Sequence, residues 1–139
     1  MNDRFKFRIY CKSEKKMMLF NNPTLIDGDI MHGGILFKNY DHKIRNCHEV
    51  NPEDLILMQC TGLKDKNGKL IYEGDIINIW CKNLTKNQIS DVFYCEERAA
   101  FCFHYETDYG NIVPCTMDKT EMEVIGNIYE NSELLKECE

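Results

Sequence analysis

The amino-acid sequence predicts a mainly β protein, a small barrel or sandwich built from hairpins, with a short C-terminal helix. Two observations lead to this fold class. Short apolar runs of strand length recur along the chain, and turn residues such as Gly, Asn and Asp separate them. A chain of 139 residues is also large enough to bury one hydrophobic core. We therefore expect a single domain over residues 1–139.

The first part of that domain, residues 1–20, is predicted to be an N-terminal hairpin. Phe5, Phe7 and Ile9 alternate with basic residues, and a period of two is typical of a half-buried strand. The polar stretch "KSEKK" then precedes a second apolar run. Residues 21–54 have little periodicity and several Gly, which predicts an irregular segment with one or two short strands. Long irregular segments often serve as binding loops.

Residues 55–130 are predicted to form the β core. Leu55–Cys60 is an apolar run, Asn67 and Gly68 suit a turn, and Leu70–Tyr72 is the expected partner strand. After a break at Gly74, the next strand carries large or apolar residues on both faces, as inside a small barrel.

Further strands are expected near 89–95 and 99–105, followed by a short edge strand around Pro114. A closing strand begins near Met122. Residues 131–139 are predicted to be the terminal helix, capped by Asn131.

The net charge and the cysteine content indicate which binding partners and which cellular compartment to expect. A net charge of −6 makes general nucleic-acid binding unlikely, because that binding depends on basic residues that displace counterions. The sequence has neither an apolar run long enough for a membrane helix nor a secretion signal. We therefore expect a protein of the bacterial cytoplasm that does not bind membranes, with its eight cysteines as free thiols.

Two stretches, "MQCTGLKDKNGKLIYEGDI" and "VIGNIYENSELLK", resemble the signature of the YopX family, and the opening "RFKFRIYCKSEKKMM" resembles that family's first strand and turn. The family consists of small proteins of phages and prophages. The resemblance implies a small β-barrel fold, a phage origin and a tendency to form homo-oligomers. It supplies no catalytic residues.

The residue types of the signature indicate a role in folding. Its glycines suit turns or close backbone approach, and Asp65 and Asn67 suit hydrogen bonds within a turn. Tyr72, Ile76 and Ile79 suit core positions. We interpret the signature as a set of fold requirements rather than a ligand site.

Cysteine and histidine gather in two places without the spacing of a metal site. The first set is His42, Cys47 and His48; the second is Cys95, Cys102, His104 and Cys115. Structural zinc sites usually contain paired ligands two to four residues apart, and no Cys-x-x-Cys occurs here. We predict no metal, no cofactor and no catalytic residues.

Aromatic residues offer the more suggestive pattern. Phe101, Phe103 and Tyr105 alternate along one predicted strand, Arg98 precedes them, and Trp80 lies on another strand. Aromatic planes beside Arg can stack a base and hold its phosphate, although they also build ordinary barrel cores. We interpret the two Phe residues as core. The candidate ligand-binding residues are Arg98, Trp80 and Tyr105, with Arg45 from the irregular segment.

These observations favour a non-enzymatic phage accessory protein that binds and sequesters a host factor. Our first candidate is a nucleotide-type defence signal, held at a subunit interface; this choice relies partly on analogy with other small phage β-proteins. One alternative is a protein-binding inhibitor of a host enzyme or nuclease, acting through residues 21–51 and an acidic surface. Another is a nucleic-acid-binding barrel that uses Lys64, Lys66 and Lys69.

Overall fold

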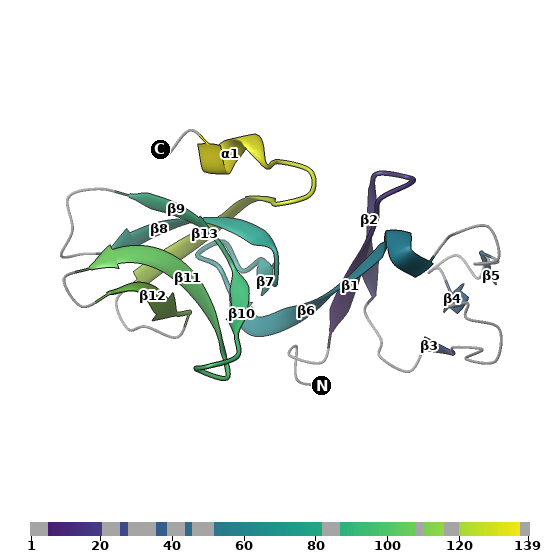
Figure 1. Ribbon diagram of the computed structural model, residues 1–139, viewed down its shortest axis with the longest axis horizontal. Coiled ribbons are helices and arrows are strands. Elements are labelled where there is room, and N and C mark those ends of the chain that lie inside the picture. The colour runs from purple at the N-terminus through teal and green to yellow at the C-terminus, as the bar shows by residue number, and fades with distance from the viewer. Residues whose placement is uncertain are drawn as a thin grey trace. The chain divides into compact units, whose positions relative to one another are not determined.

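The computed structural model is mainly β, as predicted (Figure 1). Its described residues gather into two compact units, which we treat separately: unit 2 lies within Phe5–Gln59, and unit 1 lies within Cys60–Glu139. Whether the chain acts as one domain stays a prediction. The structure describes residues 6–20, 26–27, 36–38, 44–45, 52–81, 87–107, 110–115 and 120–136.

Unit 2 contains the predicted N-terminal hairpin. Strand β1 (Phe7–Cys11) pairs antiparallel with β2 (Lys16–Phe20), and its other edge pairs with the first half of β6 (Leu55–Lys64). A short 3-10 turn, η5 (Pro52–Asp54), precedes β6. Ile9 and Cys11 of β1 are buried, but so are Arg8 and Tyr10 on the opposite face, so β1 is a strand as predicted but not a half-buried one.

The segment predicted to be irregular contains three very short strands instead of one or two. They are β3 (Ile26–Asp27), β4 (Leu36–Lys38) and β5 (Ile44–Arg45), paired in the order β3-β4-β5. Arg45 ends β5, but its side chain lies outside the described part of the chain, as do His42, Cys47 and His48. The Arg45 prediction therefore stays a prediction.

Unit 1 begins within β6, whose second half pairs with β7 (Leu70–Tyr72) as predicted. The strand runs on to Lys64 instead of ending at Cys60, with a register irregularity that includes Gly62 at φ 84°. Thr61 spans this irregularity, because its Oγ1 donates to the Ile71 carbonyl at 2.8 Å and accepts from Leu63 N at 3.1 Å.

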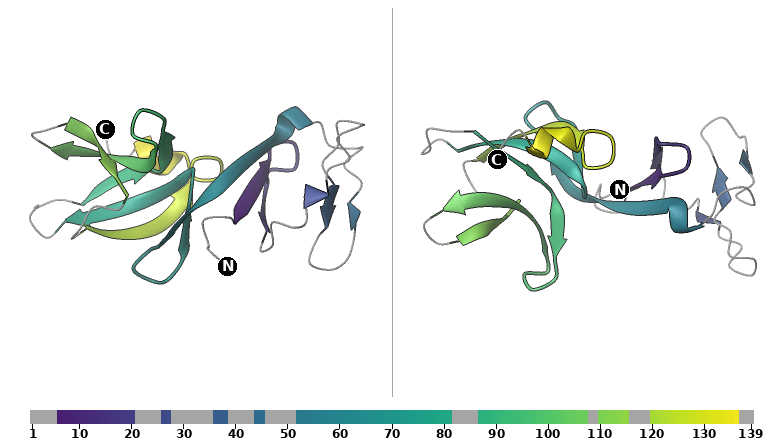
Figure 2. Two further views of the ribbon diagram at one scale, coloured as in Figure 1. Left: turned by 90° about the horizontal axis from the view of Figure 1, so that it is seen from below. Right: turned by 45° about the horizontal axis from the view of Figure 1, so that its top comes forward.

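Two three-stranded antiparallel sheets form the rest of unit 1 (Figures 1 and 2). The first has β8 (Asp75–Cys81) in the middle, with β13 (Thr120–Asn127) and β9 (Gln88–Asp91) at its sides. The second has β11 (Ala100–Thr107) between β10 (Phe93–Cys95) and β12 (Gly110–Pro114). Pro114 lies in an edge strand of its sheet, as predicted.

The prediction of one strand near residues 89–95 was wrong, because the chain breaks at Val92 and feeds two sheets. Val92 N donates to the Asp75 carbonyl, and the Val92 carbonyl accepts from Gly74 N, both at 2.8 Å. These bonds tie Val92 to the turn before β8, so β9 pairs with β8 whereas β10 pairs with β11. The two sheets also meet where His104 N donates to Ser90 Oγ at 2.9 Å.

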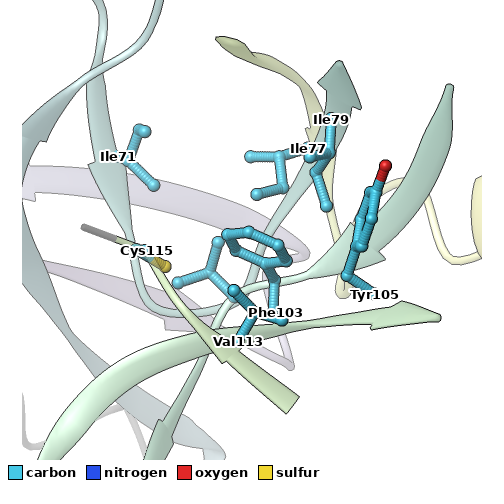
Figure 3. Packing of buried hydrophobic residues seen from close by; sticks show 8 residues of the cluster. Ile71, Ile77, Ile79, Phe103, Tyr105, Val113 and Cys115 are labelled. Atoms are coloured by element: carbon cyan, nitrogen blue, oxygen red, sulfur yellow. The ribbon is translucent and has the colours of Figure 1, made fainter. Parts of the chain in front are cut away.

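The hydrophobic core of unit 1 lies between these two sheets. Figure 3 shows Ile77 and Ile79 of β8 on one side and Phe103, Tyr105 and Val113 on the other. Ile71 and Cys115 belong to the same buried cluster, and Phe101 packs against it. The interpretation of Phe101 and Phe103 as core residues is therefore confirmed.

The chain after β13 crosses the outer face of the β13-β8-β9 sheet and ends in α1 (Glu133–Lys136), the short helix that was predicted (Figures 1 and 2). Helix α1 contacts β9. Asn131 was predicted to cap this helix, but its side chain turns back: Oδ1 accepts from Asn127 N at 3.2 Å, and it is the Asn131 carbonyl that accepts from Leu134 N at 3.0 Å. No helix in the described ranges has the length and apolar character needed to cross a bilayer.

Candidate functional site

The polar groups of the glycine-rich signature are satisfied within the fold. The Asp65 carboxylate accepts three backbone N–H bonds: Oδ1 from Asn67 and Lys69 at 2.9 Å each, and Oδ2 from Val124 at 3.0 Å. Burial alone would raise the pKa of Asp65, but these hydrogen bonds and the Lys69 charge outweigh it and lower the pKa. Asp65 is thus an anion committed to structure.

The other signature residues have similar roles. Asp75, only 1% exposed, accepts from Tyr72 N through Oδ2 at 2.8 Å. Asn127 Oδ1 accepts from Tyr129 N and Glu130 N at 3.1 and 2.9 Å. These bonds close turns and join strands, which supports the interpretation of this stretch as a set of fold requirements.

The cysteines of the β10-β11-β12 sheet are poor candidates for nucleophiles. Burial raises the pKa of Cys115 to about 12, with a smaller contribution from Cys102. Burial, and then the neighbouring Cys95, also raises the pKa of Cys102. Both groups are therefore thiols at neutral pH, whereas nucleophilic attack needs the thiolate.

The described cysteine and histidine residues form neither a metal site nor a disulfide. Within the described ranges, no group of three or more His, Cys, Asp or Glu side chains could hold a metal ion. Five described cysteines are free: Cys11, Cys60, Cys95, Cys102 and Cys115.

The structure separates the predicted ligand-binding residues. Tyr105 is 3% exposed and packs edge-on against Phe103 in the core, whereas Trp80 is 55% exposed. Arg98 is exposed in the turn between β10 and β11. From Ala100, at the start of β11, five residues of strand lead to Tyr105, about 16 Å at the usual rise per residue.

Trp80 and Arg98 also lie toward opposite ends of unit 1. The arrowheads of β8 and β11 point the same way in Figure 1, and Trp80 is near the arrowhead end of β8. The β10–β11 turn that carries Arg98 lies at the other end of β11. A single chain therefore does not bring Arg98 beside Trp80.

Trp80 instead lies on the outer face of the β13-β8-β9 sheet, the face that the segment after β13 crosses, and we call it the Trp80 face. Side chains alternate along a strand, and directly paired residues share a face. Ile77 and Ile79 point into the core, so Asn78 and Trp80 point the other way, together with their partners in the sheet. Among the described residues, the Trp80 face consists of Asn78, Trp80, Ile89, Glu121 and Glu123.

The two carboxylates of the Trp80 face differ in their partners. Glu123 forms an ion pair with Lys66 at 3.1 Å and accepts from Asn67 Nδ2 at 3.4 Å. Glu121, directly opposite Trp80, is exposed and has no ion-pair or hydrogen-bond partner among the residues that the structure describes. The exposed indole thus has a carboxylate beside it that no cation from the described ranges neutralises.

Sequence reasoning missed Glu121 and Asn78. The alternation in "TEMEVIG" does place Glu121 and Glu123 on one face and Met122 and Val124 on the other. The signal that was lacking is the register: nothing in the sequence says that Glu121 pairs with Trp80 across 40 intervening residues.

Comparisons with known proteins give a family and a fold. A family model described as "YopX protein" matches residues 6–136. The chain is similar to the crystal structure of protein YopX from Bacillus subtilis, with a TM-score of 0.64 and 18% identity, over 97% of this chain and 99% of that one. It is also similar to protein EF1440 from Enterococcus faecalis, with a TM-score of 0.55 and 26% identity, over 94% and 96%. No curated protein matches the sequence.

Proposed function

Because this chain belongs to the YopX family, we propose that it is a phage or prophage accessory protein that binds and sequesters a host factor without catalysing a reaction. It acts in the bacterial cytoplasm, as a homo-oligomer. The observation that carries the proposal is the exposure of Trp80, 55%, on the middle strand of a sheet. Tryptophan is among the residue types enriched at the positions that dominate binding in protein interfaces.

Two further observations support binding rather than catalysis. The signature carboxylates Asp65 and Asp75 accept backbone N–H bonds, so they are committed to the fold. The thiols of Cys102 and Cys115 have raised pKa values, so neither supplies a thiolate near pH 7. These two carboxylates and two thiols are therefore poor candidates for catalytic groups.

A nucleotide-type defence signal remains one candidate for the sequestered factor. Three of the residues predicted to bind it have described side chains. Trp80 can stack a base, but Tyr105 is 3% exposed and Arg98 lies toward the other end of unit 1. A phosphate near Trp80 would meet the Glu121 carboxylate, unless a second copy supplied Arg98 at a subunit interface.

A protein partner is the candidate that the geometry favours. The Trp80 face places a large aromatic side chain beside a carboxylate that has no counter-charge among the described residues, and the whole chain has a net charge of −6. Interfaces between proteins commonly combine an aromatic anchor with charge complementarity. Direct nucleic-acid binding is less well supported, because Lys66 already pairs with Glu123.

Isothermal titration and partner capture together distinguish the two candidates. We expect no heat from cyclic nucleotides or ADP-ribose derivatives, and a stoichiometric host protein bound to the purified chain. Trp80→Ala should release that protein. Tyr94→Ala is the matched control, because Tyr94 is an aromatic residue of similar exposure, 47%, in the other sheet. Saturable binding of a nucleotide, abolished by Arg98→Ala, would favour the nucleotide instead.

If neither a nucleotide nor a host protein binds, sequestration itself is contradicted. A host protein that binds wild type, Trp80→Ala and Tyr94→Ala equally would leave sequestration standing but move the contact away from Trp80. The two failures are therefore distinguishable by the same set of variants.

A further inference from the structure

We propose that the Trp80 face docks a basic segment of a partner protein, with an arginine guanidinium stacked on the Trp80 indole and hydrogen-bonded to the Glu121 carboxylate. The inference rests on the proposed binding function and adds the chemistry of the partner. Its starting point is the pairing of Trp80 with Glu121 across β8 and β13.

The distance between these two side chains suits one planar cation. Directly opposed residues of an antiparallel pair have Cβ atoms about 4.5–5.5 Å apart on the same face of the sheet. A guanidinium that lies on the indole can therefore reach the neighbouring carboxylate. Both side chains are exposed, so an arriving side chain can contact them without displacing part of the fold.

The electrostatics of the face favour a cation. Glu123 has Lys66 as its counter-charge, whereas Glu121 has none among the described residues. The Oδ1 atom of Asn78, on the same face, is buried and has no hydrogen-bond donor within the described part of the structure, so its partial negative charge is also uncompensated. A net charge of −6 adds long-range attraction for a basic partner.

Arginine fits this face better than lysine. Its guanidinium is flat, so it stacks on an indole, and its fork of N–H donors can bind a carboxylate through two parallel hydrogen bonds. Lysine offers a compact ammonium that is held by charge alone.

A second copy of this chain fits the face less well. Arg98 is its exposed arginine in a described turn, but Glu96 and Glu97 precede it directly and are also exposed. Docking that turn on the Trp80 face would bring two carboxylates close to Glu121. Like charges at an interface are destabilising, so a basic segment from another protein is the better occupant.

The test uses Trp80 fluorescence, because Trp80 is the only tryptophan of the chain. The full-length protein is titrated at low ionic strength with a capped peptide of alternating arginine and serine. We expect a saturable change in emission that weakens as salt is added. A lysine–serine peptide of the same length should bind more weakly, and a glutamate–serine peptide should have no effect.

Charge-removing variants locate the contact. Glu121→Gln should weaken binding about fivefold, the factor expected for one exposed ion pair of good geometry. Glu97→Gln is the matched control, since it removes the same charge from an exposed turn in the same unit, and it should bind like wild type. Far-ultraviolet circular dichroism of each variant checks that the fold is intact.

Three results would overturn the inference: no change in emission with the arginine peptide, equal binding by Glu121→Gln and wild type, or preference for lysine over arginine. An emission change caused by protein concentration alone, and removed by Arg98→Ala, would identify a second copy as the occupant and also overturn it. If the peptide binds as expected but cells yield no host partner, the docking chemistry stands and the proposed function fails.

Discussion

Asp65 joins two parts of the chain that are far apart in sequence. One carboxylate fixes the turn after β6 through Asn67 N and Lys69 N, and it holds β13 through Val124 N. In the same turn, Lys66 N donates to the Met122 carbonyl at 2.9 Å. The turn thus occupies the outer edge of β13, which would otherwise offer unpaired backbone groups to another strand.

We predict that Asp65→Asn lowers the free energy of unfolding by about 1–3 kcal/mol at neutral pH, because an amide cannot offer two acceptor oxygens to three backbone donors. The pKa of Asp65 is lowered in the folded state, so its contribution is present above the ordinary value of 3.8 and is lost as the pH falls through the folded pKa. The gap between wild type and variant should therefore narrow below pH 3.8. Urea unfolding at several pH values measures it.

Asp91→Asn is the control for this series, since it changes the same groups at a half-buried position of β9. A gap that stays constant from neutral to acidic pH would show that the Asp65 charge does not stabilise the fold.

Ala99 occupies a backbone conformation that favours glycine. Its φ is 48° in the turn between β10 and β11, where Ala99 N donates to the Glu96 carbonyl at 3.2 Å. Residues with a Cβ atom are strained in this region. We predict that Ala99→Gly raises the free energy of unfolding by about 1 kcal/mol.

Urea unfolding monitored by circular dichroism tests this prediction. Glu97→Gly is the control, because Glu97 does not have a positive φ. This substitution should lower the free energy of unfolding, since glycine there only adds conformational freedom to the unfolded chain. Equal effects of the two substitutions would contradict the explanation.

At the scale of elements, the junction between β13 and the C-terminal segment depends on close packing. A Cβ atom at Gly126 would come within 2.7 Å of Asn131 Oδ1 and 2.8 Å of Asn131 Cβ. The Asn131 side chain therefore lies against the backbone at Gly126, where its Oδ1 also accepts from Asn127 N. A side chain at position 126 would therefore collide with Asn131.

We predict that Gly126→Ala destabilises the fold by about 1–3 kcal/mol through this overlap. Adding Asn131→Gly should make the double variant more stable than the sum of the two single effects, because the overlapping atoms are gone. Thermal unfolding of the four proteins completes the cycle.

Gly68→Ala is the comparison, since nothing lies within 4 Å of its added Cβ and its cost comes only from a φ of +81°. Asn131→Gly should not offset that cost. If the destabilisation of the Gly126→Ala, Asn131→Gly double variant equals the sum of the two single effects, the contact between Gly126 and Asn131 does not contribute to stability.

Local chemistry explains which elements the sequence predicts correctly. The Asn67-Gly68 turn is recognisable because residue type alone determines it. The alternation in β1 identifies a strand but not its burial, since Arg8 and Tyr10 are buried as well as Ile9 and Cys11. The break at Val92 is not recognisable from residue type, since it depends on hydrogen bonds to Gly74 and Asp75 from another part of the chain. An apolar run cannot show that its two halves pair in different sheets.

The same limit applies to the candidate site. The sequence suggested Trp80 and Tyr105 alike as ligand-binding residues, because composition cannot separate an exposed ring such as Trp80 from a buried one such as Tyr105. Glu121 gains its significance only from strand register. Candidate sites made of side chains from several strands are therefore predicted less well than turns.

At the scale of the whole molecule, the described residues divide their roles. One group of residues stabilises the turns of unit 1: the signature glycines, Asp65, Asp75 and Asn127. The face of the β13-β8-β9 sheet that points away from the core carries Trp80 and Glu121. We propose that recognition takes place on this face and that the partner is held rather than chemically changed.

Native mass spectrometry of the protein recovered from its bacterial host tests this claim most directly. We expect wild type, as a homo-oligomer, to carry an unmodified host protein in a fixed stoichiometry, and Glu121→Arg to lose it because the new charge repels a basic partner. The Glu97→Arg control should keep the partner. Wild-type protein that carries no host factor, or a complex that Glu121→Arg leaves intact, would contradict binding through the Trp80 face.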